Sequence, residues 1–199
     1  MPKTETLPPE PRSPYAATKL EGEMLCRKFA EAGGLLTVCL RYFNVFGPRE
    51  NPRSLYAAAI PAFIERALKT EMLTIYGDGT QTRDFIFVKD IAAANIFFAM
   101  KSPATGIFNV ACGASLTINE LASMIRRLTG SSSRIEHASA RAGDVKYSAA
   151  SVENVHVAGF VPRFDIRDGL EATIAYFKSS LGPAAKPAAG QAGFRRYRE

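Results

Sequence analysis

The sequence predicts an α/β fold with a mainly parallel sheet, and two observations lead to this prediction. Amphipathic helical patterns alternate along the chain with short, nearly unbroken apolar runs. An apolar run without polar alternation is typical of a strand that is covered on both faces, as in a parallel sheet. The composition fits one substantial core, because 47% of the 199 residues are hydrophobic and 22% are charged.

The first helix has the clearest boundaries. Residues 1–12 are a proline-rich loop, and Ser13 and Pro14 suit the N-cap and first turn of a helix that runs to a Gly-Gly stop. The apolar run 35–41 follows and predicts a buried strand.

The alternation continues along the rest of the chain. Asp90 could cap its helix, Pro61 kinks its helix or opens its second half, and Thr117 and Glu120 are spaced as a capping box. The further predicted helices are 55–69, 90–101, 116–130 and 165–182, and the further predicted strands are 73–79, 84–88, 106–112 and 134–140.

Composition also narrows the class of protein. The longest apolar stretches reach about half of the ~20 residues that a membrane span needs, and the start is proline-rich and acidic, so we expect a cytoplasmic protein without a membrane partner. Cys26, Cys39 and Cys112 lack a C-x-x-C spacing and are expected to be reduced core thiols. The two histidines join no ligand pattern, so no metal is expected.

The net charge of +6 does not point to nucleic acid. Residues 183–199 carry four basic residues and one acidic residue, so they supply half of the charge, and their Pro, Ala and Gly content predicts a flexible basic tail. The remaining charge is ordinary for a protein that binds an anionic small molecule. We therefore expect no nucleic-acid partner.

Two sets of residues could carry chemistry. Tyr15 and Lys19 lie four residues apart on one helical face, where an ammonium would lower the phenol pKa and allow general-base catalysis. Arg83 and Arg141, in different loops, could clamp a diphosphate while Tyr76 stacks on a base. The alternatives are a solvated Tyr-Lys pair, which is common by chance, and structural salt bridges for either arginine.

Five ordered segments carry a resemblance to a known family: "PRSPYAATKLEGE", "LRYFNVFGPRENP", "LTIYGDGTQTRDFIFVKDIAAAN", "GIFNVACG" and "RAGDVKYS". In order and spacing they resemble the carboxyl half of the NAD-dependent nucleotide-sugar 4-epimerases, of the extended short-chain dehydrogenase/reductase family. The resemblance covers about residues 1–182. It implies an incomplete Rossmann-type, doubly wound sheet that lacks its N-terminal strands, plus a small α/β substrate-binding domain.

The resemblance implies roles for individual residues. Tyr15 would take the proton from the sugar 4-hydroxyl while hydride passes from C4 to NAD, and Lys19 would hold the nicotinamide ribose and lower the Tyr15 pKa. Tyr42 and Phe43 would line the nicotinamide pocket. The residues that would bind the UDP-sugar are Asn44 at the diphosphate or sugar, Arg83 and Arg141 at the diphosphate, Asp144 near the ribose, and Thr74 and Tyr76 beside uracil.

Three departures from the family pattern concern the sugar. Phe85 stands where some members have Tyr, and Ala58 and Ala59 replace an Asn-Leu pair. Ser148 stands where strict UDP-glucose/UDP-galactose epimerases can carry a bulky Tyr, so room for an N-acetyl group is expected. The resemblance therefore implies UDP-N-acetylglucosamine/galactosamine as substrates, with UDP-glucose/galactose as further candidates. The alternative is that Ser148 is a loop residue without a role in specificity.

The resemblance also implies a division of the chain. Residues 1–49 and 85–112 would belong to the NAD-binding domain, and residues 50–84 and 113–182 to the substrate domain. No glycine-rich strand-turn-helix is present in the 199 residues, nor is the family's catalytic Ser/Thr upstream of Tyr15. We therefore expect a truncated or split epimerase that is inactive alone, with exposed apolar faces and an unpaired sheet edge.

Two other functions stay open. One is a fragment of a nucleotide-sugar 4,6-dehydratase or decarboxylase of the same superfamily. The other is a non-catalytic UDP-sugar-binding subunit that completes a separately encoded N-terminal half. A homodimer is also compatible with the sequence.

Overall fold

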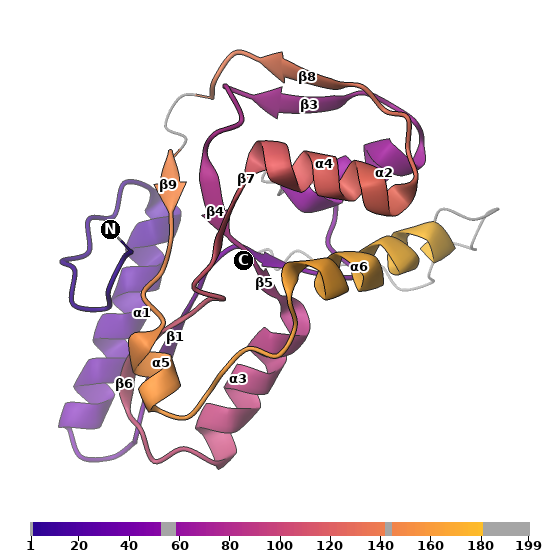
Figure 1. The fold of residues 1–199 in the computed structure, drawn as a ribbon. Helices are drawn as coiled ribbons and strands as arrows, with labels where there is room; N and C mark the ends of the chain where they lie inside the picture. Colours follow the sequence, from indigo (N-terminus) through magenta and orange to yellow (C-terminus); the bar gives the residue numbers. More distant parts are fainter. Residues whose placement is uncertain (1, 53–58, 142–144, 181–199) are drawn as a thin grey trace, which may run out of the picture.

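The computed structural model describes residues 2–52, 59–141 and 145–180; the predicted tail and Asp144 lie outside them. The helices are α1 (Pro14–Glu31), α2 (Ala59–Leu68), α3 (Val88–Met100), α4 (Ile118–Thr129), α5 (Glu153–Val157) and α6 (Ile166–Ser180) (Figure 1). The strands are β1 (Val38–Tyr42), β2 (Val45–Phe46), β3 (Leu73–Tyr76), β4 (Thr82–Asp84), β5 (Ile86–Phe87), β6 (Gly106–Val110), β7 (Ser115–Thr117), β8 (Ile135–Ala138) and β9 (Tyr147–Ser148).

The strands pair mainly in parallel, which confirms the predicted α/β class. β1 pairs with β6, β2 with β5, β3 with β8, and β4 with β9, all in parallel register. The described antiparallel pair is β4 with β7. The order β1-β6 joins strands from distant parts of the chain, with α3 on the crossover between them, as a parallel sheet requires.

Two apolar cores hold the elements in place. The first lies among α2, α4, α6 and β3, where Ile64, Leu121 and Leu170 are fully buried. The second lies among α3, α5 and β6. β5 joins the two, because Ile86 packs into the second core while its neighbour Phe87 packs into the first.

Two predicted helix caps are confirmed. The Ser13 hydroxyl accepts a hydrogen bond from the Ala16 N–H at 3.2 Å, and a proline occupies the first turn of α1. At α4 the Thr117 hydroxyl accepts from the Glu120 N–H, and the Glu120 carboxylate accepts from the Thr117 N–H. These local signals act within one turn of helix, so tertiary packing does not override them.

The prediction that Asp90 caps its helix is wrong. β5 runs directly into α3, which begins at Val88, so Asp90 lies inside the first turn and is almost completely buried. Its carboxylate accepts hydrogen bonds from the N–H groups of Arg163 and Phe164, at 2.9 and 3.2 Å. Asp90 therefore anchors the loop before α6.

The cysteines are free thiols; Cys112 packs against the second core, whereas the prediction that Cys26 and Cys39 lie in the core is wrong. All three are partly exposed, and α1, which carries Cys26, has no buried residue over its described length. Burial of Cys112 raises its thiol pKa to about 12, and the negative charges of Asp84 and Asp90 add to this effect.

β1 and β6 lie between α1 and α3 (Figure 1), so a helix contacts each face of β1, but the expectation that this strand is buried is wrong. Within the described residues β1 pairs only with β6, and its side chains are half-buried or exposed. Large apolar side chains of α1 are exposed as well, among them Met24, Leu25 and Phe29. The expected unpaired edge and apolar exposure are thus present around α1 and β1.

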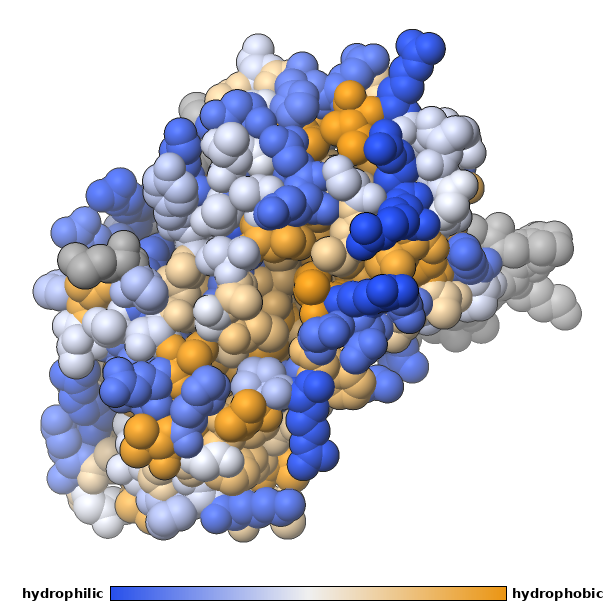
Figure 2. All heavy atoms as spheres, viewed as in Figure 1, coloured by the Kyte–Doolittle hydropathy of each residue, from blue (hydrophilic) through white to orange (hydrophobic). Residues whose placement is uncertain are grey.

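Hydrophobic side chains also reach the surface on the face shown in Figure 2, where orange and tan atoms gather near its middle. No helix among the described residues is long and apolar enough to cross a membrane.

Candidate functional site

A cavity of about 390 Å³ lies against α2, β3 and β4. Its apolar wall includes Phe46, Phe63 and Phe85. Five of the residues that the sequence predicts for substrate binding line this cavity: Asn44, Thr74, Tyr76, Arg83 and Arg141. The fold thus brings together side chains from segments almost one hundred residues apart in the chain.

Asn44 lies between β1 and β2 and is fixed by a hydrogen bond to the backbone. Its side-chain Nδ2 donates to the Asp84 carbonyl oxygen at 2.8 Å. This bond orients the carboxamide at the cavity, because the amide nitrogen is held on the side of β4.

Arg83 lies on β4 and is held by backbone carbonyls. Its Nη1 donates to the oxygens of Thr82 and Val145, at 2.8 and 2.6 Å. Ser148 pairs with Arg83 in the parallel β4-β9 register and is half-buried. The guanidinium therefore lies in a fixed position, which lowers the entropy cost of binding an anion.

Tyr76 and Arg141 contact each other at the rim of the cavity. The guanidinium carbon of Arg141 lies 4.0 Å from the centroid of the Tyr76 ring, in a cation–π geometry. Both residues are exposed. An aromatic face and a cation are thus presented side by side to a ligand in the cavity.

Two further polar residues line the cavity, and sequence reasoning missed both. Arg66 on α2 donates from Nη1 to the Thr74 hydroxyl at 2.9 Å, and Gln81 donates from Nε2 to the Tyr76 carbonyl at 2.7 Å. Arg66 reads as a solvated helix residue in the sequence, so no local signal marks it. With Arg83 and Arg141 it makes the cavity cationic.

Asp84 connects the cavity to the loop after β6. Its side chain is completely buried, and its carboxylate accepts from the N–H groups of Cys112 and Gly113 at 2.9 and 3.0 Å. Burial raises the Asp84 pKa, whereas these backbone donors lower it. Because its carbonyl oxygen also holds Asn44, Asp84 positions a cavity residue without lining the cavity.

Tyr15 and Lys19 lie in the first two turns of α1. The Lys19 Nζ atom lies 5.3 Å from the centroid of the Tyr15 ring, so the helical spacing does bring ammonium and phenol together. Tyr15 is 72% exposed. Among the described lining residues of the cavity, neither member of the pair occurs.

Tyr42 and Phe43 lie at the carboxyl end of β1. The Tyr42 hydroxyl donates to the Asn95 side chain at 2.9 Å, and the Phe43 N–H donates to the Val110 carbonyl at 3.2 Å. Tyr42 is 46% exposed. The residues expected at the cofactor thus lie on an open face of the described structure.

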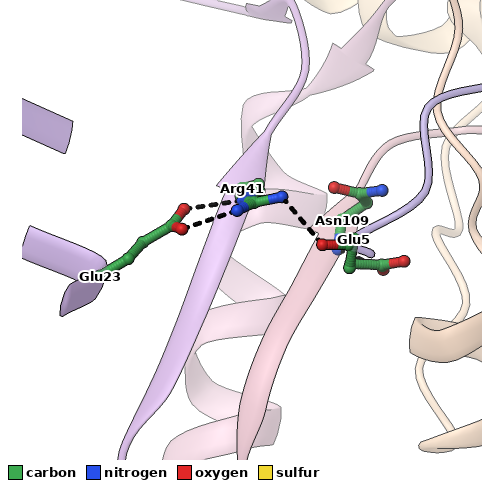
Figure 3. Close-up of polar contacts among 4 residues, drawn as sticks. All are labelled: Glu5, Glu23, Arg41 and Asn109. Carbon is green, nitrogen blue, oxygen red and sulfur yellow. Dashed lines mark hydrogen bonds and ion pairs between the residues drawn. The ribbon is translucent and has the colours of Figure 1, made fainter. Parts of the chain in front are cut away.

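The segment before α1 is tied to the sheet by a polar cluster (Figure 3). Arg41 on β1 donates from Nε and Nη2 to the two carboxylate oxygens of Glu23, both at 2.7 Å, and from Nη1 to the Glu5 carbonyl at 3.4 Å. The Glu5 carboxylate accepts from the Asn109 N–H at 2.8 Å. The hydrogen bond to Glu23 raises the pKa of Arg41, and the cluster joins the segment before α1 to both strands of the β1-β6 pair.

Comparisons with known proteins agree with the fold. Residues 1–111 match the model of the NAD dependent epimerase/dehydratase family. The chain is 34% identical over 175 residues to the low-salt glycan biosynthesis protein Agl12 of Haloferax volcanii, covering 87% of this chain and 55% of the relative. It is 31% identical over 180 residues to a putative UDP-glucose 4-epimerase of Methanocaldococcus jannaschii, covering 90% and 58%.

Two solved structures are similar over most of the chain. A UDP-N-acetylglucosamine 4-epimerase of Methanobrevibacter ruminantium in complex with UDP-N-acetylmuramic acid is 44% identical, with a TM-score of 0.87 over 91% of this chain and 58% of that one. A UDP-glucose 4-epimerase of Thermotoga maritima with UDP-glucose is 35% identical, with a TM-score of 0.85 over 90% and 58%.

The chain spans somewhat more than half the length of these relatives. The match to the family model covers over half of the chain, and the structural similarity continues beyond it. The chain therefore belongs to the NAD dependent epimerase/dehydratase family.

Proposed function

We propose that this chain is the nucleotide-sugar-binding and acid/base part of an NAD-dependent UDP-sugar 4-epimerase. The cationic cavity supports this proposal most directly, because it combines fixed arginines with an aromatic face and a side-chain amide. Such a set suits a ligand with a diphosphate, a base and a sugar.

Each cavity residue then has a role. Arg83 and Arg141 bind the diphosphate, Thr74 and Tyr76 flank the uracil, and Asn44 binds the diphosphate or sugar. Asp144, outside the described residues, binds near the ribose. Residues 50–84 and 113–182 form the substrate domain in this proposal.

Tyr15 acts as the acid/base. It accepts the proton of the sugar 4-hydroxyl and later returns it, and the Lys19 ammonium lies beside its ring. NAD would supply an acceptor and donor of hydride at C4 of the sugar. Lys19 offers N–H donors that would hold the nicotinamide ribose. Tyr42 and Phe43, at the carboxyl end of β1, would form a wall of the nicotinamide pocket. Residues 1–49 and 85–112 form the NAD-binding part in this proposal.

The proposed sugars are UDP-N-acetylglucosamine/galactosamine, with UDP-glucose/galactose as further candidates. Ser148 supports this choice, since it presents a small side chain on β9 beside Arg83. The similarity to an enzyme described as a UDP-N-acetylglucosamine 4-epimerase points the same way.

A second candidate has support in the relatives. The chain is 31% identical over 176 residues to a dTDP-glucose 4,6-dehydratase of Streptomyces griseus, and 43% identical over 124 residues to a UDP-N-acetyl-alpha-D-glucosaminuronate decarboxylase of Bacillus cytotoxicus. A dehydratase or decarboxylase fragment would use the same cavity. Product analysis in a complete enzyme distinguishes them, because an epimerase returns an isomer of its substrate.

Calorimetry of the chain with UDP tests the proposed site. We expect UDP to bind, and Arg83→Ala and Arg141→Ala each to weaken binding by about 10–100-fold, the equivalent of one or two charge-assisted hydrogen bonds. Arg167→Ala is the matched control, because Arg167 is exposed on α6 and pairs with Glu171. Absence of UDP binding, or equal losses in all three variants, would contradict the proposal.

A pull-down tests whether the exposed surface of α1 and β1 accepts a separate polypeptide. The bait is the full chain, and the prey is an amino-terminal segment of a relative that carries the glycine-rich nucleotide-binding turn. Complex formation with recovery of NAD-dependent epimerisation supports a split enzyme. UDP binding with complex formation but without turnover supports the non-catalytic subunit instead.

A further inference from the structure

α1 and β1, which contact each other, each carry one cysteine: Cys26 on the helix and Cys39 on the strand. Thr37 and Arg41 flank Cys39 on one side of the strand, because alternate strand residues point to the same face. The Thr37 hydroxyl donates to the Cys26 carbonyl oxygen at 3.2 Å, and Arg41 binds Glu23 at 2.7 Å.

Glu23 and Cys26 are three residues apart on α1 and therefore share a helix face. The strand residues on each side of Cys39 thus both contact the helix turn that carries Cys26. Both side chains lie within this contact, close enough for Cys26 to raise the pKa of the Cys39 thiol.

We propose that Cys26 and Cys39 form a dithiol site that closes into an intramolecular disulfide by exchange with a low-molecular-weight disulfide. The Cys26 thiolate attacks one sulfur of that disulfide, a mixed disulfide forms, and one small thiolate leaves. The Cys39 thiolate then attacks the Cys26 sulfur, the protein disulfide forms, and the second small thiolate leaves. The protein loses two electrons and two protons, and the external disulfide is reduced to two thiols.

The surroundings of the pair support this order of steps. Both thiols are partly exposed on a helix and strand that the described residues leave largely open, so a small disulfide can reach them. Burial, together with Cys26 and the charge of Glu23, raises the Cys39 pKa to about 11, while Arg41 lowers it. Cys39 is therefore a poor first nucleophile, and in the second step its low thiolate fraction is offset because the attack on the mixed disulfide at Cys26 is intramolecular.

The cross-link would fix α1 to the sheet. It closes the stretch from Cys26 to Cys39, which includes the end of α1 and the turn into β1. A closed loop of this length restricts the unfolded chain, and we expect Tm to rise by about 5–10 °C on oxidation. The inference concerns α1, which carries Tyr15 and Lys19, and it does not depend on the proposed activity.

Mass spectrometry of the full chain tests the site. The reduced protein is incubated with oxidised glutathione, quenched with acid and mapped without reduction. The expected product has lost two hydrogen atoms and contains a Cys26–Cys39 peptide, in the wild type and in Cys112→Ser alike, and dithiothreitol reverses both the mass change and the rise in Tm.

The control variant is Cys26→Ser, which should give no intramolecular disulfide and no rise in Tm. Stable glutathione adducts on both Cys26 and Cys39, cross-links between chains, a disulfide that includes Cys112, or thiols left unmodified would each overturn the proposal. An unchanged rise in Tm in Cys26→Ser would overturn it as well.

Discussion

Replacement of Asp84 by Asn should destabilise the protein while keeping the side-chain shape. The buried carboxylate accepts hydrogen bonds from the N–H groups of Cys112 and Gly113, and a third backbone donor, Ala150, also lowers its pKa. Asparagine has one oxygen for these donors, and its NH₂ group would face at least one N–H. A buried N–H without an acceptor costs about 1–3 kcal/mol.

Burial moderates this loss. The Asp84 pKa is raised by burial, so the carboxylate itself carries a desolvation cost that neutral Asn avoids. We therefore expect the free energy of unfolding to fall by about 2 kcal/mol, which corresponds to a Tm lower by about 4–8 °C for a chain of this size.

Thermal unfolding followed by circular dichroism measures the effect of Asp84→Asn. The matched control is Asp78→Asn, because Asp78 is exposed and accepts hydrogen bonds from the N–H and hydroxyl of Thr80 in a surface turn. Its Tm should stay close to that of the wild type. Equal Tm values for wild type and Asp84→Asn would refute the assignment of the carboxylate as the anchor of the loop after β6.

Three further changes have defined outcomes. Burial raises the Glu50 pKa to about 7 from its usual 4.5, so the folded state must ionise this carboxyl at a cost, and the free energy of unfolding should fall as the pH rises from 4.5 to about 7. The full pKa shift would equal about 3 kcal/mol, and we expect a fall in the free energy of unfolding of about half this amount, because the carboxyl is only partly buried. Urea titrations at a series of pH values measure this dependence, and it should be weaker in Glu50→Gln. The same pH dependence in the variant and the wild type would contradict the role given to Glu50. Glu23→Gln breaks the paired carboxylate of Arg41 and should lower the free energy of unfolding by about 1–3 kcal/mol in urea, whereas an unchanged midpoint would show that the ion pair contributes nothing. In a complete enzyme, Ser148→Tyr should reduce kcat/KM for N-acetylated UDP-sugars by at least about tenfold relative to UDP-glucose, and equal ratios in both enzymes would exclude a role for this position in specificity.

The fold class was predictable because its signals are local. The alternation of helices with apolar runs indicated parallel pairing, and the caps at Ser13 and Thr117 depend on atoms within one helical turn. The resemblance also named five residues that line one cavity, although their roles remain predictions.

What the sequence did not indicate depends on distant partners. The sequence suggests Asp90 as a helix cap, but its carboxylate oxygens accept hydrogen bonds from backbone N–H groups more than seventy residues later in the chain. Arg66 reads as a surface residue because its contact with Thr74 exists only after α2 packs beside β3. Cys26 and Cys39 read as core thiols because the apolar runs around them do not reveal that α1 buries nothing in the described structure.

The lack of buried residues in α1 has a consequence for hydrogen exchange. A helix of this length is only marginally stable without packing, so its amides are protected mainly by its own hydrogen bonds, its cap and the Arg41 contact. The amides of α4, whose apolar face lies in the first core, should open only with the whole domain. We therefore expect the amides around Tyr15 and Lys19 to exchange faster than those of α4, and a partner that covers α1 should slow their exchange.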